Sequence, residues 1–231
     1  MRVIIHQPQY FPYPGFFHKL SLAEKYVILD NTQYDKRFTN RNRILAESDA
    51  IWLTVPINKK HKFLPNNRVE INNEIDWQTE HWKKIYHSYK NSSFFSNYSE
   101  YLKQIFSKKW EHLFELDFET LKKTIKWLGI KIEIIKESEL NINSQSTQRL
   151  VDICKQVGAN TYISGKGLPN KQYMEKELFE KEGITLEYQN YTSVEYKQRN
   201  SESFIPDLSI LDLLFNCGEN SMEIIRQTNK N

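Results

Sequence analysis

Val3–Gly15 reads VIIHQPQYFPYPG, and Tyr26–Asp30 reads YVILD. Each stretch is a short apolar run that ends abruptly in polar residues. Strands of a parallel sheet are buried on both faces and read as continuous apolar runs, and ligands bind just beyond their carboxyl ends. The two stretches therefore predict neighbouring strands, with a ligand site where His6, Gln7 and Asp30 follow them.

The remainder of the chain alternates between short β-rich runs and amphipathic segments. Strands are expected over 2–5, 26–29, 51–57, 131–136, 161–164 and 184–188. Helices are expected over 16–24, 77–89, 94–114, 118–128, 145–157, 171–182 and 209–216, and polar loops over 31–42 and 58–67. Strands that alternate with helices indicate an α/β protein with a mostly parallel sheet.

We expect residues 1–231 to form a single α/β domain. The aromatic-rich helices at about 76–128 interrupt the alternation, so they are interpreted as an inserted helical layer over the sheet edge or the site. The five tryptophans could form a sugar-stacking surface, but their mostly helical spacing favours core packing. The last dozen residues are polar and are expected to fray.

The charge balance is nearly even, with 32 basic and 29 acidic residues and a net charge of +3. Such a chain has no global basic field, so bulk nucleic-acid binding is not indicated. Two cysteines, Cys154 and Cys217, fit a reducing compartment. No secretory signal and no membrane span of ~18 apolar residues is recognised, so we expect a cytoplasmic protein.

His6 and Asp30 are the candidate catalytic residues. His6 would bind or protonate substrate at the end of its strand, or else it stiffens its own turn by a hydrogen bond. Asp30 would hold a ribose hydroxyl, a ligand amine or a metal; alternatively it caps a helix or pairs with a nearby arginine. Gln7 and Tyr10 supply the polar and aromatic surroundings of a substrate.

A basic stretch between the second and third expected strands predicts phosphate binding. Arginine grips phosphate with two parallel hydrogen bonds, and asparagine both donates and accepts. A solvated basic loop is the alternative. The candidate substrate-binding residues here are Tyr34, Lys36, Asn40, Arg41, Asn42 and Arg43, with Arg37 among the cations.

Two other basic segments carry weaker indications. Lys59–Lys62 is interpreted as a surface loop. Lys166 lies in a Ser-Gly-Lys-Gly turn after a strand, which suits a ligand loop but lacks the spacing of a Walker motif. No Cys-x-x-Cys, His-Glu-x-x-His or Gly-x-Ser-x-Gly motif occurs, so no metal is predicted.

Several separated motifs together resemble the WbqC-like proteins. They are His6–Pro12 with Gly15, Ile28–Asp30 with Gln33 and Tyr34, Asn40–Ile44, Trp52–Pro56 and Pro206–Gly218. The resemblance implies a bacterial protein associated with O-antigen or capsule biosynthesis. Thr192–Glu195 departs from the His-Pro pair of that family, so no catalytic role is assigned to this segment.

More distantly, the arrangement resembles the Rossmann-like fold of nucleotidylyltransferases and pantothenate synthetase. Those enzymes carry a His-x-Gly-His signature, whereas Pro14–His18 lacks the first histidine. Adenylyl transfer is therefore only suggested by this second resemblance.

The leading hypothesis is a transferase that attaches an acyl or aminoacyl group to a nucleotide-linked amino sugar. Its co-substrate would be an activated acyl donor or ATP. The alternatives are a glycosyltransferase or nucleotidylyltransferase of the same lipopolysaccharide pathway, or a non-catalytic scaffold of the assembly machinery.

Overall fold

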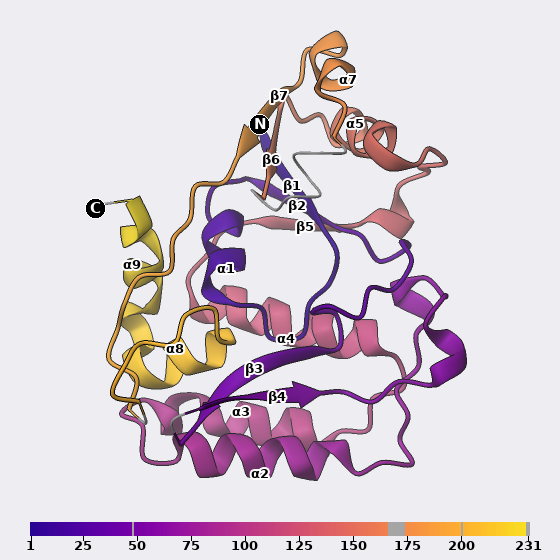
Figure 1. Ribbon diagram of the computed structural model, residues 1–231. Helices are drawn as coiled ribbons and strands as arrows, with labels where there is room; N and C mark the ends of the chain where they lie inside the picture. Colours follow the sequence, from indigo (N-terminus) through magenta and orange to yellow (C-terminus); the bar gives the residue numbers. More distant parts are fainter. Residues whose placement is uncertain (48, 166–173, 200, 230–231) are drawn as a thin grey trace.

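A five-stranded, all-parallel sheet forms the centre of the computed structural model, which describes residues 1–47, 49–165, 174–199 and 201–229 (Figure 1). The strand order is β5-β2-β1-β6-β7. The strands are β1 (Arg2–His6), β2 (Lys25–Ile28), β5 (Glu133–Lys136), β6 (Thr161–Ser164) and β7 (Thr185–Tyr188). The predicted α/β class with a parallel sheet is confirmed.

Both faces of the central strands are buried, which is why these strands read as continuous apolar runs. In β1, Ile4 packs into one hydrophobic cluster, and its neighbours Val3 and Ile5 pack into the other. Helices α1 (Pro14–Leu20) and α4 (Leu113–Trp127) contribute to the first cluster. Helices α5 (Ser146–Gln156) and α7 (Lys176–Lys181) contribute to the second.

The chain reverses its direction of travel across the sheet beside β1. It runs from β1 to β2 and then to β5 on one side, and returns to place β6 and β7 on the other side. The carboxyl ends of β1 and β6 therefore flank the switch point of a doubly wound sheet. In open α/β sheets this position is the usual place for a ligand.

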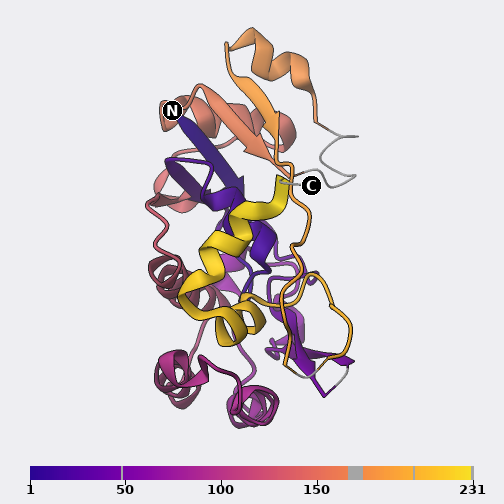
Figure 2. The ribbon, with the colours of Figure 1, turned by 90° about the vertical axis from the view of Figure 1, so that its left-hand side faces the viewer.

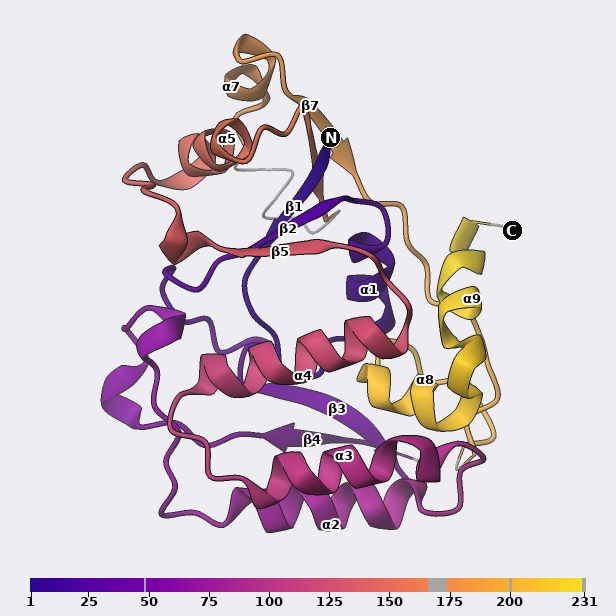
Figure 3. The same cartoon turned by 180° about the vertical axis from the view of Figure 1, so that it is seen from behind.

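A long insertion between β2 and β5 forms a second layer below the sheet in Figures 1 and 3. Besides α4, it contains an antiparallel hairpin, β3 (Arg41–Ala46) and β4 (Asp49–Thr54), with α2 (Trp77–Tyr89) and α3 (Phe95–Ser107). Short 3-10 turns occupy Lys59–His61, Asn66–Arg68 and Glu137–Glu139. The inserted aromatic helices are thus present, and the insertion also includes the hairpin.

The chain ends in helices that pack beside this layer. They are α8 (Ile210–Cys217) and α9 (Ser221–Arg226), with 3-10 turns at Gly218–Asn220 and Gln227–Asn229. Figure 2 shows both helices running along one side of the molecule. The expected frayed tail is therefore wrong for residues up to 229, because Met222 and Ile225 bury their side chains.

The hairpin corrects two local predictions. The loop expected over 31–42 ends where β3 begins at Arg41, and the strand expected over 51–57 pairs with β3 rather than with the main sheet. The outward arginines of β3 alternate with inward Asn42 and Ile44, so a strand was hidden by its polar residues. Helix boundaries also shift: α3 ends at Ser107, and α4 begins at Leu113.

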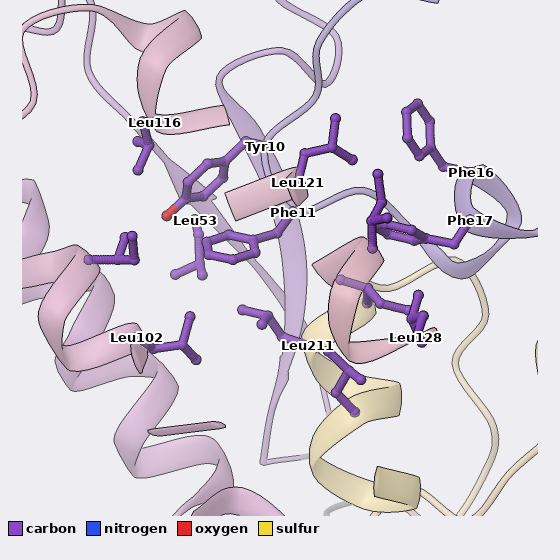
Figure 4. Packing of buried hydrophobic residues seen from close by; sticks show 14 of the residues in the cluster. Tyr10, Phe11, Phe16, Phe17, Leu53, Leu102, Leu116, Leu121, Leu128 and Leu211 are labelled. Carbon is purple, nitrogen blue, oxygen red and sulfur yellow. The ribbon is translucent and has the colours of Figure 1, made fainter. Parts of the chain in front are cut away.

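The loop after β1 is held by aromatic side chains that enter the core between the layers. Figure 4 shows Tyr10 and Phe11 packed among leucines of the hairpin, α3 and α4. Trp77 and Trp110 are buried, as the core interpretation of the tryptophans requires, whereas Trp52 on β4 is exposed. In the described part of the chain, no helix combines the length and apolar character needed to cross a membrane.

Asp117 of α4 is fully buried, and neither of its carboxyl oxygens has a hydrogen-bond partner among the described residues. Burial raises the pKa of Asp117 well above its usual value. A carboxyl whose folded-state pKa is raised stabilises the fold less as the pH rises from its unfolded pKa of about 4. The protein therefore carries a stability cost at neutral pH.

Asp117→Asn is expected to increase the free energy of unfolding by about 1–3 kcal/mol at pH 7. The gain should disappear near pH 3, where the carboxyl is protonated in both the folded and the unfolded chain. Urea denaturation at the two pH values measures this. A loss of stability at pH 7 would show that Asp117 is ionised and has partners in solution.

Candidate functional site

A cavity of about 570 Å³ opens at the carboxyl edge of the sheet, at the switch point. The ends of three strands border it: His6 ends β1 and Gln7 follows it, Gly165 follows β6, and Gln189 follows β7. Segment 35–39 and helix α1 supply further walls. We call this cavity the crevice; its volume lies in the range of small-molecule sites.

His6 presents a defined tautomer to the crevice. Its Nδ1 lies 2.9 Å from the carbonyl oxygen of Gln7. A carbonyl only accepts hydrogen bonds, so Nδ1 carries the proton and Nε2 carries the lone pair. Burial and the nearby positive charge of Lys19 lower the pKa of His6 to about 3. The imidazole is therefore neutral at physiological pH and has the form a proton acceptor needs.

Lys19 is a crevice residue that the sequence analysis missed. It belongs to α1, whose seven residues are all buried, and only 5% of Lys19 is exposed. Burial lowers the pKa of its ammonium group to about 8. A single lysine in a short helix gives no recognisable sequence pattern. The available signal was the apolar character of most of the other residues of α1, which leaves no polar face that would be exposed to water.

Gln189 ties the end of β7 to α1 and closes one wall of the crevice. Its Nε2 donates to the carbonyl oxygen of Gly15 at 2.7 Å and lies 2.9 Å from Nδ1 of His18. Because an amide nitrogen only donates, Nδ1 of His18 is the acceptor. Elsewhere in the crevice lining, Arg37 pairs with Asp35 at 2.6 Å. The buried Gln189 contacts therefore hold the end of β7 against α1.

Asp30 does not line the crevice. It is 2% exposed, and its carboxylate accepts hydrogen bonds from the backbone N–H and Oγ of Ser138, at 2.9 and 2.6 Å. Asn67 adds a third, longer contact at 3.4 Å. These bonds join the end of β2 to the turn after β5. Asp30 therefore occupies the strand end that was predicted, with its oxygens already engaged.

Four of the predicted binding residues are buried and bonded internally. Tyr10 hydroxyl lies 2.9 Å from Nδ1 of His81, and Tyr34 hydroxyl donates to Oδ1 of Asn40 at 2.7 Å. Asn42 donates to the carbonyl oxygen of Phe11 at 2.7 Å. Lys36 is exposed and outside the crevice lining, and Lys166 lies outside the described residues.

Arg41 and Arg43 share the outer face of β3 and lie beside Trp52 of β4. The Arg41 guanidinium is 4.3 Å from the centre of the Trp52 ring, and that of Arg43 is 5.9 Å away. Phe38 lies 6.3 Å from the same ring; it is 43% exposed, and Trp52 is 40% exposed. Because Phe38 also lines the crevice, this cationic and aromatic surface adjoins it.

No group of three or more His, Cys, Asp or Glu side chains among the described residues is arranged to hold a metal ion. What the crevice offers is a neutral imidazole, a buried ammonium group, and amide and guanidinium donors. These groups suit an anionic or polar organic ligand.

Fold and crevice together define a doubly wound α/β protein with a cavity, the candidate ligand site, at its switch point. The family model of the WbqC-like protein family matches residues 7–224, and the chain belongs to this family. The uncharacterized protein Rv1507c of Mycobacterium tuberculosis is 29% identical over 228 residues, which is 97% of each chain. No solved structure gives a significant match. The resemblance read from the motifs is thus confirmed.

Proposed function

We propose that the protein is a transferase of bacterial surface-polysaccharide biosynthesis that attaches an acyl or aminoacyl group to the amine of a nucleotide-linked amino sugar. One observation carries the proposal: a crevice of about 570 Å³ lies at the switch point, with the neutral imidazole of His6 in its wall. A carbonyl oxygen fixes this imidazole so that Nε2 is free of a proton. We place the reaction in the cytoplasm.

The chemistry needs a base because only a neutral amine attacks a carbonyl carbon. The amine nitrogen forms the new bond to the acyl carbon, and its proton passes to Nε2 of His6. The bond between the acyl carbon and its leaving group then breaks, and the leaving group takes the electron pair. His6 can return the proton to it. His6 is preferred to Asp30 for this role because the Asp30 oxygens are engaged by Ser138.

The cationic and aromatic surface beside the crevice suits the nucleotide part of the substrate. Exposed Trp52 and Phe38 offer ring faces for stacking, and two guanidinium groups stand next to them. A nucleotide seated there would direct its sugar toward His6.

Incubation with a panel of nucleotide-linked amino sugars and activated acyl donors, including ATP with amino acids or other carboxylic acids, tests the reaction. We expect one pair to give a sugar product whose mass has increased by the acyl group. Release of free nucleotide without acylation would instead indicate glycosyl transfer, and formation of pyrophosphate alone would indicate nucleotidylyl transfer. If no pair changes mass, the acyl-transfer proposal is wrong.

Arg41→Ala or Arg43→Ala is expected to weaken binding of the nucleotide-linked sugar by about 1.5–3 kcal/mol, the range for charged hydrogen bonds. Lysine should restore only part of the loss because it lacks the two-pronged geometry. Isothermal titration measures the affinity, with exposed Arg226→Ala on α9 as the matched control. Unchanged affinity in both variants would place the nucleotide elsewhere.

A further inference from the structure

Lys19 is an unmatched cation in the wall of the crevice. Among the described residues, its ammonium group has neither a hydrogen bond nor an ion pair, although Lys19 is only 5% exposed. Asp35, the acidic residue of the crevice lining, is already bound to Arg37 by an ion pair and two hydrogen bonds. A largely buried charge without a partner is costly, so Lys19 lowers the stability of the fold.

We propose that Lys19 binds a phosphoryl group of the substrate inside the crevice and so places the reacting group beside His6. The inference rests on the proposed use of this crevice as the site of transfer. An anion that enters supplies the missing partner of Lys19, which recovers part of the cost of burying the charge.

The other donors of the crevice favour a phosphoryl group over a carboxylate. Gln7, Gln9 and Arg37 also line the crevice. A phosphoryl group has three strongly accepting oxygens and up to two negative charges, whereas a carboxylate has two oxygens and one charge. The crevice therefore offers several donors besides Lys19, as the larger anion requires.

Occupation of this site would also prepare the base. The positive charge of Lys19 is, after burial, the largest cause of the low pKa of His6. An anion bound to Lys19 offsets that charge, so the pKa of His6 rises toward the range in which an imidazole accepts a proton effectively. Substrate binding and base strength would be coupled through one lysine.

Anion binding should be accompanied by proton uptake at pH 8. Burial lowers the pKa of Lys19 to about 8, so a part of the protein carries a neutral amine there, and a bound anion returns it to the charged form. Among the described residues, the other titratable groups that line or adjoin the crevice have pKa shifts that take them away from this pH: His6, His18, Asp35, Arg37, Tyr13, Tyr162 and Tyr191.

Isothermal titration with UDP and with ATP, in two buffers of different ionisation enthalpy, measures both affinity and proton uptake. Lys19→Met should weaken binding at least tenfold. Lys19→Arg should retain most of the affinity but lose the uptake of protons at pH 8, since arginine stays charged. Lys126→Met, an exposed lysine on α4, is the matched control and should behave like the parent.

Three results would overturn the inference: parental affinity in Lys19→Met, unchanged proton uptake in Lys19→Arg, or acetate binding as tightly as UDP. If Lys19→Met does not fold, the uptake measured on Lys19→Arg decides. The outcome is separable from that of the transfer reaction. UDP binding that depends on Lys19, with no acyl transfer for any donor, would retain the phosphoryl site and reject the transferase. Transfer that proceeds at the parental rate in both Lys19→Arg and Lys19→Met would retain the transferase and reject the phosphoryl site at Lys19.

Discussion

His6→Asn is expected to lower the rate of acyl transfer by about 10²–10⁴-fold, the usual contribution of a general base. Asparagine was chosen because its amide N–H can replace the Nδ1–H that donates to the carbonyl of Gln7. The loop geometry should then be kept while the Nε2 lone pair is lost. Affinity for UDP should change by no more than a few-fold, because the variant removes no positive charge.

Single-turnover assays by mass spectrometry measure the transfer step apart from binding. Asp30→Asn is the informative comparison, because Asp30 is the other carboxyl-edge candidate and its oxygens are bound to Ser138. We expect folded Asp30→Asn to keep most of the transfer rate. If Asp30→Asn abolishes transfer while His6→Asn is active, Asp30 is the general base and His6 is not.

The sheet and the position of the crevice, the candidate site, could be predicted because both depend on local patterns. β1 and β2 are buried on two faces, so their residues are uniformly apolar, and the polar residues that follow mark the edge where ligands bind. This pattern predicted the position of His6, which is the last residue of its strand and lines the crevice.

The roles of the polar side chains on the hairpin could not be predicted, because they depend on partners far away in the sequence. Asn42 looks like a phosphate ligand in the motif Asn-Arg-Asn-Arg, but it bonds to a carbonyl 31 residues away. Asn40, just before β3, likewise donates to the carbonyl oxygen of Val55, just after β4. Lys19 shows the reverse case: a residue that looks ordinary in sequence becomes distinctive only when the fold buries its charge.

The motif Pro206–Gly218 near the end of the chain also has a structural explanation. Asp212 of α8 is buried, and its two oxygens accept hydrogen bonds from Tyr89 at 2.8 Å, Tyr196 at 2.7 Å and Gln198 at 3.0 Å. The Tyr89 hydroxyl in turn accepts the backbone N–H of Leu45 on β3 at 2.8 Å. One carboxylate thus joins the hairpin, α2, the segment before α8 and α8 itself.

Asp212→Ala is expected to lower the free energy of unfolding by about 3–5 kcal/mol, because it leaves several buried donors without their acceptor. Asp212→Asn should lose less, since its single amide oxygen can still accept from one or two of them. Urea denaturation followed by circular dichroism measures both, with exposed Glu223→Ala on α9 as the control. A loss below about 1 kcal/mol in Asp212→Ala would mean that the donors find other partners, and that apolar packing and the backbone hydrogen bond from Ser209 to Arg43 suffice to hold the hairpin to α8.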